Sequence, residues 1–278
     1  MGKKKKSASN SLEVQNAAKT LFANIRFMSP DEPIRSIVMT SSVPSEGKST
    51  TSVELARAIA TSGATVVLVE ADMRRRSLAN MLNVRGRAGA YAVLAEQVTL
   101  DQAVSSTGTP NLYFLDVEPN IPNPADIVSS RRYAKLVDML EREYDYVVFD
   151  TPPVGTFIAI LSTLVDGTII VVKPGSTKRD ELLGAYEQLQ KADAHVIGVC
   201  ATFCEGTGSE YYYAYYTEDG KRAKPDKGSK RAYELSESKY PAATQPSGRR
   251  SSQSAAKHDA PRRDHASVRG GSNNPRLK

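Results

Sequence analysis

The stretch from Ile37 to Ser52 constrains the fold of this chain more than any other part of the sequence. It begins with a short β-branched apolar run typical of a strand, continues in a small polar loop and ends in Gly-Lys-Ser-Thr. Apolar residues at helical spacing follow, from Val53 to Ala60. A strand that leads through such a loop into a helix presents free backbone N–H groups and the positive end of the helix dipole to an anion. The stretch therefore predicts a phosphate-binding loop.

The residue types of this loop suit a nucleotide. Gly47 lets the backbone approach a phosphate, Lys48 supplies positive charge for the β- and γ-phosphates, and the Ser49 hydroxyl suits Mg²⁺. The candidate nucleotide-binding residues are Pro44, Ser45, Glu46, Gly47, Lys48, Ser49 and Thr50. A strict motif has glycine at position 42, where this chain has Ser42. An ordinary strand, turn and helix with a chance Gly-Lys-Ser is the alternative, so the rest of the chain must decide.

Apolar runs alternate with segments of helical spacing along the rest of the chain. Strands are predicted over 36–40, 65–69, 111–117, 144–150, 167–172 and 196–202. Helices are predicted within 7–29, 53–60, 91–94, 100–104, 125–140, 157–164 and 180–192. Near-continuous apolar runs suit strands that are buried on both faces. The predicted fold class is therefore α/β, with a mainly parallel sheet and helices on both faces.

Positive charge is concentrated at the two ends of the chain. Residues 217–278 hold 15 Lys/Arg against 7 Asp/Glu, whereas residues 1–216 hold 22 against 24, including Lys3 to Lys6. An acidic body argues against nucleic acid as a partner, and basic ends suit a membrane surface or solubility. We predict a basic disordered N-terminus (1–11), one folded domain (12–205), a tyrosine cluster (206–219) and a basic disordered tail (220–278).

The sequence indicates neither a metal–cysteine site nor membrane insertion. Cys200 and Cys204 lack companion ligands at metal-site spacing, and two cysteines do not make a disulfide framework. No stretch reaches the roughly 18 to 20 apolar residues that span a bilayer. We therefore expect a cytoplasmic protein that can be tethered by a partner.

Acidic residues follow two of the predicted strands. Glu70 and Asp72 come after the strand at 65–69, and Asp150 ends the strand at 144–150. Ligands of open α/β sheets bind at the carboxyl ends of the strands, and carboxylates spaced by two share one direction if the strand persists. Phosphoryl transfer needs carboxylate oxygens for Mg²⁺ and for the proton that the acceptor loses. The pattern predicts a nucleotide triphosphatase or kinase site.

Together these motifs resemble those of the bacterial tyrosine kinases of the P-loop type, the cytoplasmic kinases of capsule and exopolysaccharide synthesis. Residues 40–50 match the family's Walker A loop, whose pattern does not require the first glycine. Residues 67–74 resemble its second acidic motif, called Walker A′, and residues 147–153 resemble its Walker B motif. The resemblance covers about residues 12–217 and implies a P-loop NTPase fold of the MinD and ParA branch.

The resemblance implies an ATP-dependent protein-tyrosine kinase that uses Mg²⁺. The implied catalytic residues are Lys48, Glu70, Asp72 and Asp150, and the implied metal ligands are Ser49, Asp72 and Asp150. The implied site of autophosphorylation in trans is the cluster of Tyr211, Tyr212, Tyr213, Tyr215 and Tyr216. A sticky aromatic segment or an edge strand is the alternative for this cluster. Tyrosines without Phe, Leu or Ile, flanked by Glu210, Glu218 and Asp219, fit a polar phosphoacceptor better.

Two departures from the family pattern stand out. Glu70 replaces the first Asp of the usual Asp-x-Asp, which keeps the carboxylate but adds a methylene. The family's Glu-x-x-Arg-x-x-Arg, which is tied to its ring-shaped oligomer, would fall on Asn16, Lys19 and Phe22. We still expect a homo-oligomer, but this sequence does not carry the ring motif.

The resemblance also implies partners. They are a membrane activator of the chain-length-regulator type, which recruits the kinase to the inner face of the membrane, a phosphotyrosine phosphatase, and protein tyrosine substrates. The alternative function is that of a MinD- or ParA-like ATPase, which positions septa or chromosomes without phosphorylating tyrosine. Those ATPases usually begin the loop with a signature lysine beside glycines, and residues 40–42 are Thr-Ser-Ser instead.

Overall fold

The structure is a computed structural model that describes residues 2–73, 75–84, 86, 88–119, 121 and 123–204, with side chains from Leu12 onward. The predicted tyrosine cluster and basic tail lie outside the described residues. No described helix is both long and apolar enough to cross a membrane.

The centre of the fold is one sheet, which the described residues build from seven strands in the order β3-β4-β2-β5-β1-β6-β7. The strands are β1 (Ser36–Ser41), β2 (Val66–Glu70), β3 (Ser105–Ser106), β4 (Leu112–Leu115), β5 (Tyr146–Asp150), β6 (Gly167–Val172) and β7 (Val196–Ala201). All neighbours pair in parallel except β3 and β4. Because β5 lies between β1 and β2, the connection from β1 through α2 to β2 passes over β5. The carboxyl ends of β1, β2 and β5 therefore meet at one edge of the sheet.

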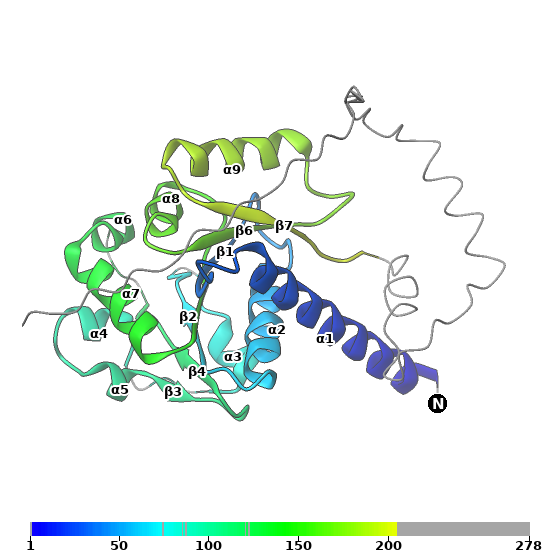
Figure 1. The fold of residues 1–278 in the computed structure, drawn as a ribbon, viewed down its shortest axis with the longest axis horizontal. Helices are drawn as coiled ribbons and strands as arrows, with labels where there is room; N and C mark the ends of the chain where they lie inside the picture. The colour runs from blue at the N-terminus through cyan, green and yellow to red at the C-terminus, as the bar shows by residue number, and fades with distance from the viewer. Residues whose placement is uncertain are drawn as a thin grey trace, which may run out of the picture. The chain divides into compact units, whose positions relative to one another are not determined.

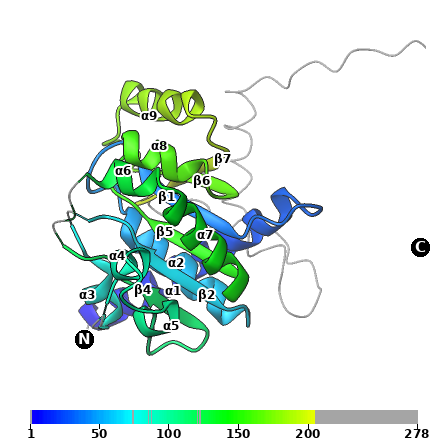
Figure 2. The same ribbon diagram turned by 90° about the vertical axis from the view of Figure 1, so that its left-hand side faces the viewer.

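Helices cover both faces of the sheet (Figures 1 and 2). On one face lie α1 (Gly2–Met28), α2 (Lys48–Thr61) and α3 (Leu78–Leu82). The other face carries α4 (Ala90–Leu94), α5 (Leu100–Ala103), α6 (Pro124–Val128), α7 (Arg131–Glu143), α8 (Thr156–Ser162) and α9 (Arg179–Lys191). Strand residues alternate between these two cores: Ile37 and Met39 pack with α2, and Val38 packs on the opposite side.

The predicted α/β fold class is confirmed, and each strand predicted from the sequence is present with bounds that differ by no more than two residues. Buried parallel strands are easy to recognise because both of their faces must be apolar. β6 is an example, since all six of its residues are buried.

The N-terminal helix is longer than predicted. α1 begins at Gly2, so Lys3 to Lys6, predicted to belong to a disordered end, are helical. The reason is local, because lysine and alanine are good helix formers and the first proline, Pro30, comes after the helix. The later part of α1 is held by tertiary packing, since Phe22 is buried and its ring meets the ring of Tyr146 edge-on at 5.2 Å between centroids.

Two further elements differ from the sequence prediction. The predicted helix at 125–140 is divided into α6 and α7 at Ser129 and Ser130. The Ser130 hydroxyl accepts a hydrogen bond from the Tyr133 N–H at 3.2 Å, which begins the new helix. β3 was not predicted, because two polar serines carry no strand pattern; it pairs antiparallel with β4 at the edge of the sheet.

Candidate active site

The loop between β1 and α2 needs a glycine where the helix begins. Gly47 has φ 87°, in the left-handed region, and α2 starts at the next residue. A Cβ at this position would lie 3.1 Å from the Phe203 ring and 3.3 Å from the Thr202 hydroxyl. The conformation and the crowding both favour glycine. The first N–H groups of α2, which have no partner within the helix, are left for a ligand.

Glu46 holds this loop in place from inside. Only 2% of it is exposed; one carboxylate oxygen accepts from the Val43 N–H at 2.9 Å, and the other accepts from the Thr177 hydroxyl. Its backbone carbonyl accepts from the Thr202 hydroxyl at 2.6 Å. The carboxylate of Glu46 therefore ties the loop to the segment after β6, and its backbone carbonyl ties the loop to the segment after β7.

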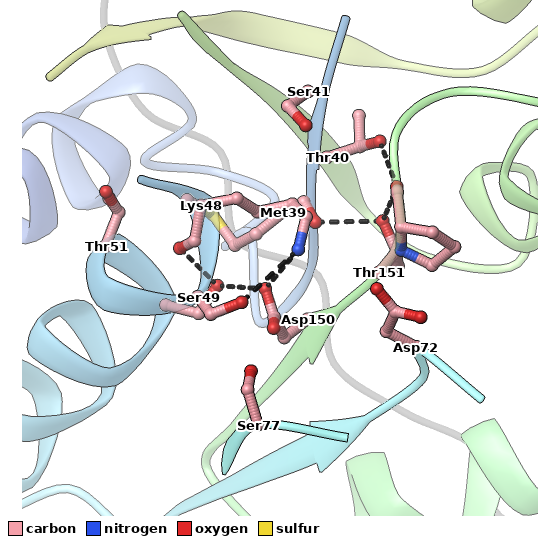
Figure 3. Close-up of polar contacts among 12 residues, drawn as sticks. Met39, Thr40, Ser41, Lys48, Ser49, Thr51, Asp72, Ser77, Asp150 and Thr151 are labelled. Carbon is pink, nitrogen blue, oxygen red and sulfur yellow. Dashed lines mark hydrogen bonds and ion pairs between the residues drawn. The ribbon is translucent and has the colours of Figure 1, made fainter. Parts of the chain in front are cut away.

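Lys48 and Asp150 form a buried ion pair at the foot of the loop (Figure 3). Lys48 Nζ lies 3.1 Å from Asp150 Oδ1, and the Ser52 hydroxyl donates to the same oxygen at 2.9 Å. Lys48 Nζ also lies 3.4 Å from the Ser49 hydroxyl oxygen. The structure thus brings together the predicted lysine, the predicted hydroxyl and one predicted carboxylate.

The second oxygen of Asp150 is left for another ligand. Asp150 is fully buried, and its Oδ2 has no hydrogen-bond partner within the described part of the chain. A buried carboxylate oxygen without a partner is costly unless an ion or water completes it. No three His, Cys, Asp or Glu side chains of the described residues form a metal cluster. The buried carboxylate oxygen of Asp150 and the Ser49 hydroxyl are oxygen ligands of the type that Mg²⁺ takes from a protein, with its other ligands from substrate phosphates and waters.

Glu70 ends β2 and lies behind the loop at 71–77. It is 1% exposed; Oε1 accepts from the Asp72 N–H at 3.2 Å, and Oε2 accepts from the N–H groups of Ser77 and Leu78 at 2.9 and 3.1 Å. Burial, with a smaller contribution from the charge of Asp150, raises the pKa of Glu70 to about 7. The side chain holds the loop that follows β2.

The shared direction predicted for Glu70 and Asp72 depends on the strand continuing, and it does not continue. β2 ends at Glu70, so Asp72 belongs to the loop, where its Oδ1 accepts from the Arg75 N–H at 2.9 Å. Figure 3 shows the Asp72 carboxylate on the far side of Asp150 from α2, with Ser77 below Asp150 in this view. The three predicted carboxylates therefore lie in different places: Asp72 at the pocket wall, Asp150 beneath Lys48, and Glu70 behind the loop at 71–77.

A pocket of about 290 Å³ lies between the loop at 42–47 and the loop at 71–77. All seven predicted nucleotide-binding residues, 44–50, line it, and Asp72, Arg75 and Ser77 form the facing wall. The predicted residues Lys48, Ser49 and Asp72 thus border one cavity, with Asp150 beneath Lys48. The predicted tyrosines at 211–216 lie outside the described residues.

Sequence reasoning missed Arg75, Ser77 and Phe203 as residues of this pocket. Phe203 follows β7, has φ 53° and is 68% exposed, and Lys173 Nζ lies 4.6 Å from its ring centroid. No local pattern marks a residue that reaches a site only because β7 ends beside the loop at 42–47. A signal for Arg75 was present, because it belongs to the run of three arginines that comes shortly after the acidic strand end.

Comparisons with known proteins decide the family. Residues 34–193 match the family model described as an AAA domain. Tyrosine-protein kinase YwqD of Bacillus subtilis (strain 168) is 32% identical over 203 residues, which cover 72% of this chain and 86% of YwqD. The crystal structure of the chimerical protein CapA2B2 has a TM-score of 0.63 at 32% identity, covering 66% of this chain and 82% of that one. The chain belongs to the bacterial P-loop tyrosine-protein kinases.

The alternative family shares the fold alone. The septum site-determining protein MinD of Pyrococcus horikoshii OT3, complexed with Mg-ADP, has a TM-score of 0.52 at 22% identity and covers 59% of this chain and 68% of its own. The predicted kinase class and the MinD-like branch of the fold are therefore both confirmed. This protein-tyrosine kinase uses ATP, as its family does.

Proposed function

We propose that the kinase reaction takes place in the pocket between the 42–47 loop and the 71–77 loop. ATP binds on the side of α2, and a protein tyrosine enters on the side of Asp72. The observation that carries this proposal is the buried Lys48–Asp150 pair at the start of α2, 3.1 Å apart. A fixed ammonium beside free helix N–H groups is a site for a phosphate chain.

Ser49, Asp72 and Asp150 are the proposed Mg²⁺ ligands. The support is the hydroxyl close to Lys48, the carboxylate on the facing wall and the buried Asp150 oxygen without a partner. Asp150 acts directly or through a water. When bound, the ion neutralises part of the charge on the transferred phosphate.

The proton of the tyrosine hydroxyl goes to Asp72. In this step the tyrosine oxygen bonds to the terminal phosphorus while the bond from that phosphorus to its bridging oxygen breaks, and ADP leaves with the electron pair. Tyrosine has a pKa of about 10 in model peptides, so a carboxylate within reach assists the transfer at neutral pH. Asp72 lines the pocket, whereas both carboxylate oxygens of Glu70 accept from backbone N–H groups. Its place at the pocket wall supports Asp72, rather than Glu70, as the proposed base.

The proposed acceptor is the cluster at 211–216 of a neighbouring molecule in a homo-oligomer. Phosphorylation adds roughly −1.5 to −2 charges per tyrosine at pH 7. Beside the acidic residues at 210, 218 and 219 these charges repel, which gives the modification a way to break an assembly.

The biological setting is proposed from the resemblance of the sequence motifs. The kinase acts in capsule or exopolysaccharide synthesis at the inner face of the cell membrane. It is recruited and activated there by a membrane protein of the chain-length-regulator type and reversed by a phosphotyrosine phosphatase. The chain alone is expected to be weakly active.

Phosphotyrosine mapping tests the proposal. Purified protein is incubated with Mg-ATP, and the peptides are analysed by mass spectrometry, which detects low stoichiometry. We expect phosphotyrosine in the wild type and none in Lys48→Met. Lys191→Met is the matched control, because that lysine is exposed at the end of α9, and it keeps the label. Unchanged labelling of Lys48→Met, or ATP hydrolysis without phosphotyrosine in the wild type, would overturn the proposal.

A further inference from the structure

Among the described residues that line the pocket, one cation has no partner of opposite charge. Among the residues that line it, Lys48 and Arg75 are positive and Glu46 and Asp72 are negative. Lys48 is already paired with the buried Asp150. Arg75 is exposed and forms no ion pair within the described residues. A triphosphate carries several negative charges, so an unpaired guanidinium at the pocket wall adds to the attraction from Lys48 and the N–H groups of α2.

The next residue shows what a structural arginine in this loop does instead. The Arg76 guanidinium forms a two-point ion pair with Asp116, with Nε 3.1 Å from Oδ1, on a carboxylate that is almost fully buried. The two consecutive arginines therefore have different environments. Arg76 fastens the loop to the end of β4, and Arg75 is left at the pocket.

The backbone of Arg75 is held at the pocket wall. Its N–H donates to Asp72 Oδ1 at 2.9 Å, and two residues later the Ser77 N–H donates to the buried Glu70 at 2.9 Å. The loop is thus fixed on both sides of Arg75. A side chain that starts from a fixed backbone loses less freedom when it binds a ligand.

We propose that Arg75 binds the terminal phosphate of the nucleoside triphosphate, across the pocket from Lys48. This inference rests on the proposed function, since it takes the pocket as the ATP site. The backbone of a phosphate-binding loop cradles the α- and β-phosphates. The phosphate that reaches the facing wall is therefore the terminal one. The planar guanidinium fork matches two phosphate oxygens at once.

The test compares Mg-ATP with Mg-ADP, because only the first carries the terminal phosphate. Both dissociation constants are measured by titration calorimetry on the full chain for Arg75→Ala, Arg75→Lys and the control Arg35→Ala. Arg35 is exposed and precedes β1, so it lies at the opposite edge of the sheet and its removal changes net charge equally. We expect Arg75→Ala to weaken Mg-ATP about tenfold and Mg-ADP less than threefold. Arg75→Lys recovers part of the loss, and Arg35→Ala changes neither constant.

Two results would overturn the inference. Equal weakening of both nucleotides would mean that Arg75 acts only as a diffuse charge, and unchanged Mg-ATP binding would mean that its guanidinium does not reach the phosphate. Failure of this inference is separable from failure of the proposed function. Lys48→Met tests whether the pocket makes phosphotyrosine, whatever the nucleotide preference of the Arg75 variants.

Discussion

Glu70 and Asp72 are two residues apart, yet the structure gives them different environments. Glu70 is 1% exposed and accepts three backbone hydrogen bonds, whereas Asp72 lines the pocket. A general base contributes about 10²- to 10⁴-fold to a rate. We therefore expect Asp72→Asn to lower kcat by about 100-fold or more and Glu70→Gln to lower it less than about tenfold. Steady-state phosphorylation of a tyrosine peptide checks both, and a larger loss for Glu70→Gln would reverse the assignment.

The buried carboxyl of Glu70 also makes folding stability depend on pH. Its pKa rises from the ordinary value of 4.5 to about 7 in the folded chain, chiefly because of burial. Between pH 4.5 and 7 the carboxyl stays protonated in the folded state and ionises in the unfolded state, so the free energy of unfolding falls as pH rises through this window. Replacing the Glu70 carboxyl with an amide removes this fall in the free energy of unfolding.

Glu70→Gln is accordingly expected to gain stability relative to the wild type as pH rises from 4.5 to 7. The relative gain is on the order of 3 kcal/mol, because one pKa unit corresponds to about 1.4 kcal/mol. Urea unfolding at a series of pH values measures it. Glu187→Gln, at an exposed position of α9, serves as the control and should follow the wild-type curve. A constant difference between Glu70→Gln and the wild type would show that the carboxyl does not titrate in this range.

At the scale of elements, α1 is part of the folded domain rather than an appendage. Its later part packs against α2, and it buries Phe22 against the sheet, where the ring meets Tyr146. Five residues further along the same helix, Phe27 is 81% exposed. The two phenylalanines share a helix and a residue type and differ in burial.

Phe22→Ala should therefore cost about 3 to 5 kcal/mol of unfolding free energy, which is the usual range for an aromatic residue removed from a core. Phe27→Ala should stay within about 0.5 kcal/mol of the wild type, because a surface substitution creates no cavity. Denaturant unfolding followed by circular dichroism compares the two. Similar small losses would mean that α1 does not contribute to the core.

Elements whose environment is uniform along their length were predictable from the sequence. β6 is recognised because it is apolar and buried along its whole length, and α2 because its buried apolar residues recur at helical spacing. The divided helix at 129–130 was not predictable from period alone, since the apolar spacing continues past the Ser130 cap. Polar β3 was missed because only its place beside β4 makes it a strand.

At the scale of the whole molecule, the site could be predicted only as far as its residues are local in sequence. The phosphate loop at 42–47 and the strand-end carboxylates follow from short motifs. The position of Phe203 does not, because it depends on where β7 ends relative to a loop more than 150 residues earlier. The direction of Glu70 also depends on the residue at which β2 stops, and strand ends are the least certain part of a sequence prediction.

The proposed transfer between molecules makes a prediction that one chain alone cannot satisfy. Lys48→Met lacks the pocket lysine but keeps every tyrosine of the 211–216 cluster, whereas a chain with those five tyrosines changed to Phe keeps the pocket and lacks the acceptors. Neither variant should carry phosphotyrosine in the cluster by itself. Mixed with Mg-ATP and the activator, the pair should label the Lys48→Met chain, because its tyrosines can enter the intact pocket of the other molecule.

The two variants are prepared in forms of different mass, so that a gel separates the two chains. Phosphotyrosine mass spectrometry then locates the label. The rate should rise with total protein concentration, since the reacting groups belong to different molecules. The control is Lys48→Met alone at the same total concentration, which should stay unlabelled. Absence of label in the mixed sample, together with concentration-independent labelling of the wild type, would show that each chain phosphorylates its own tail.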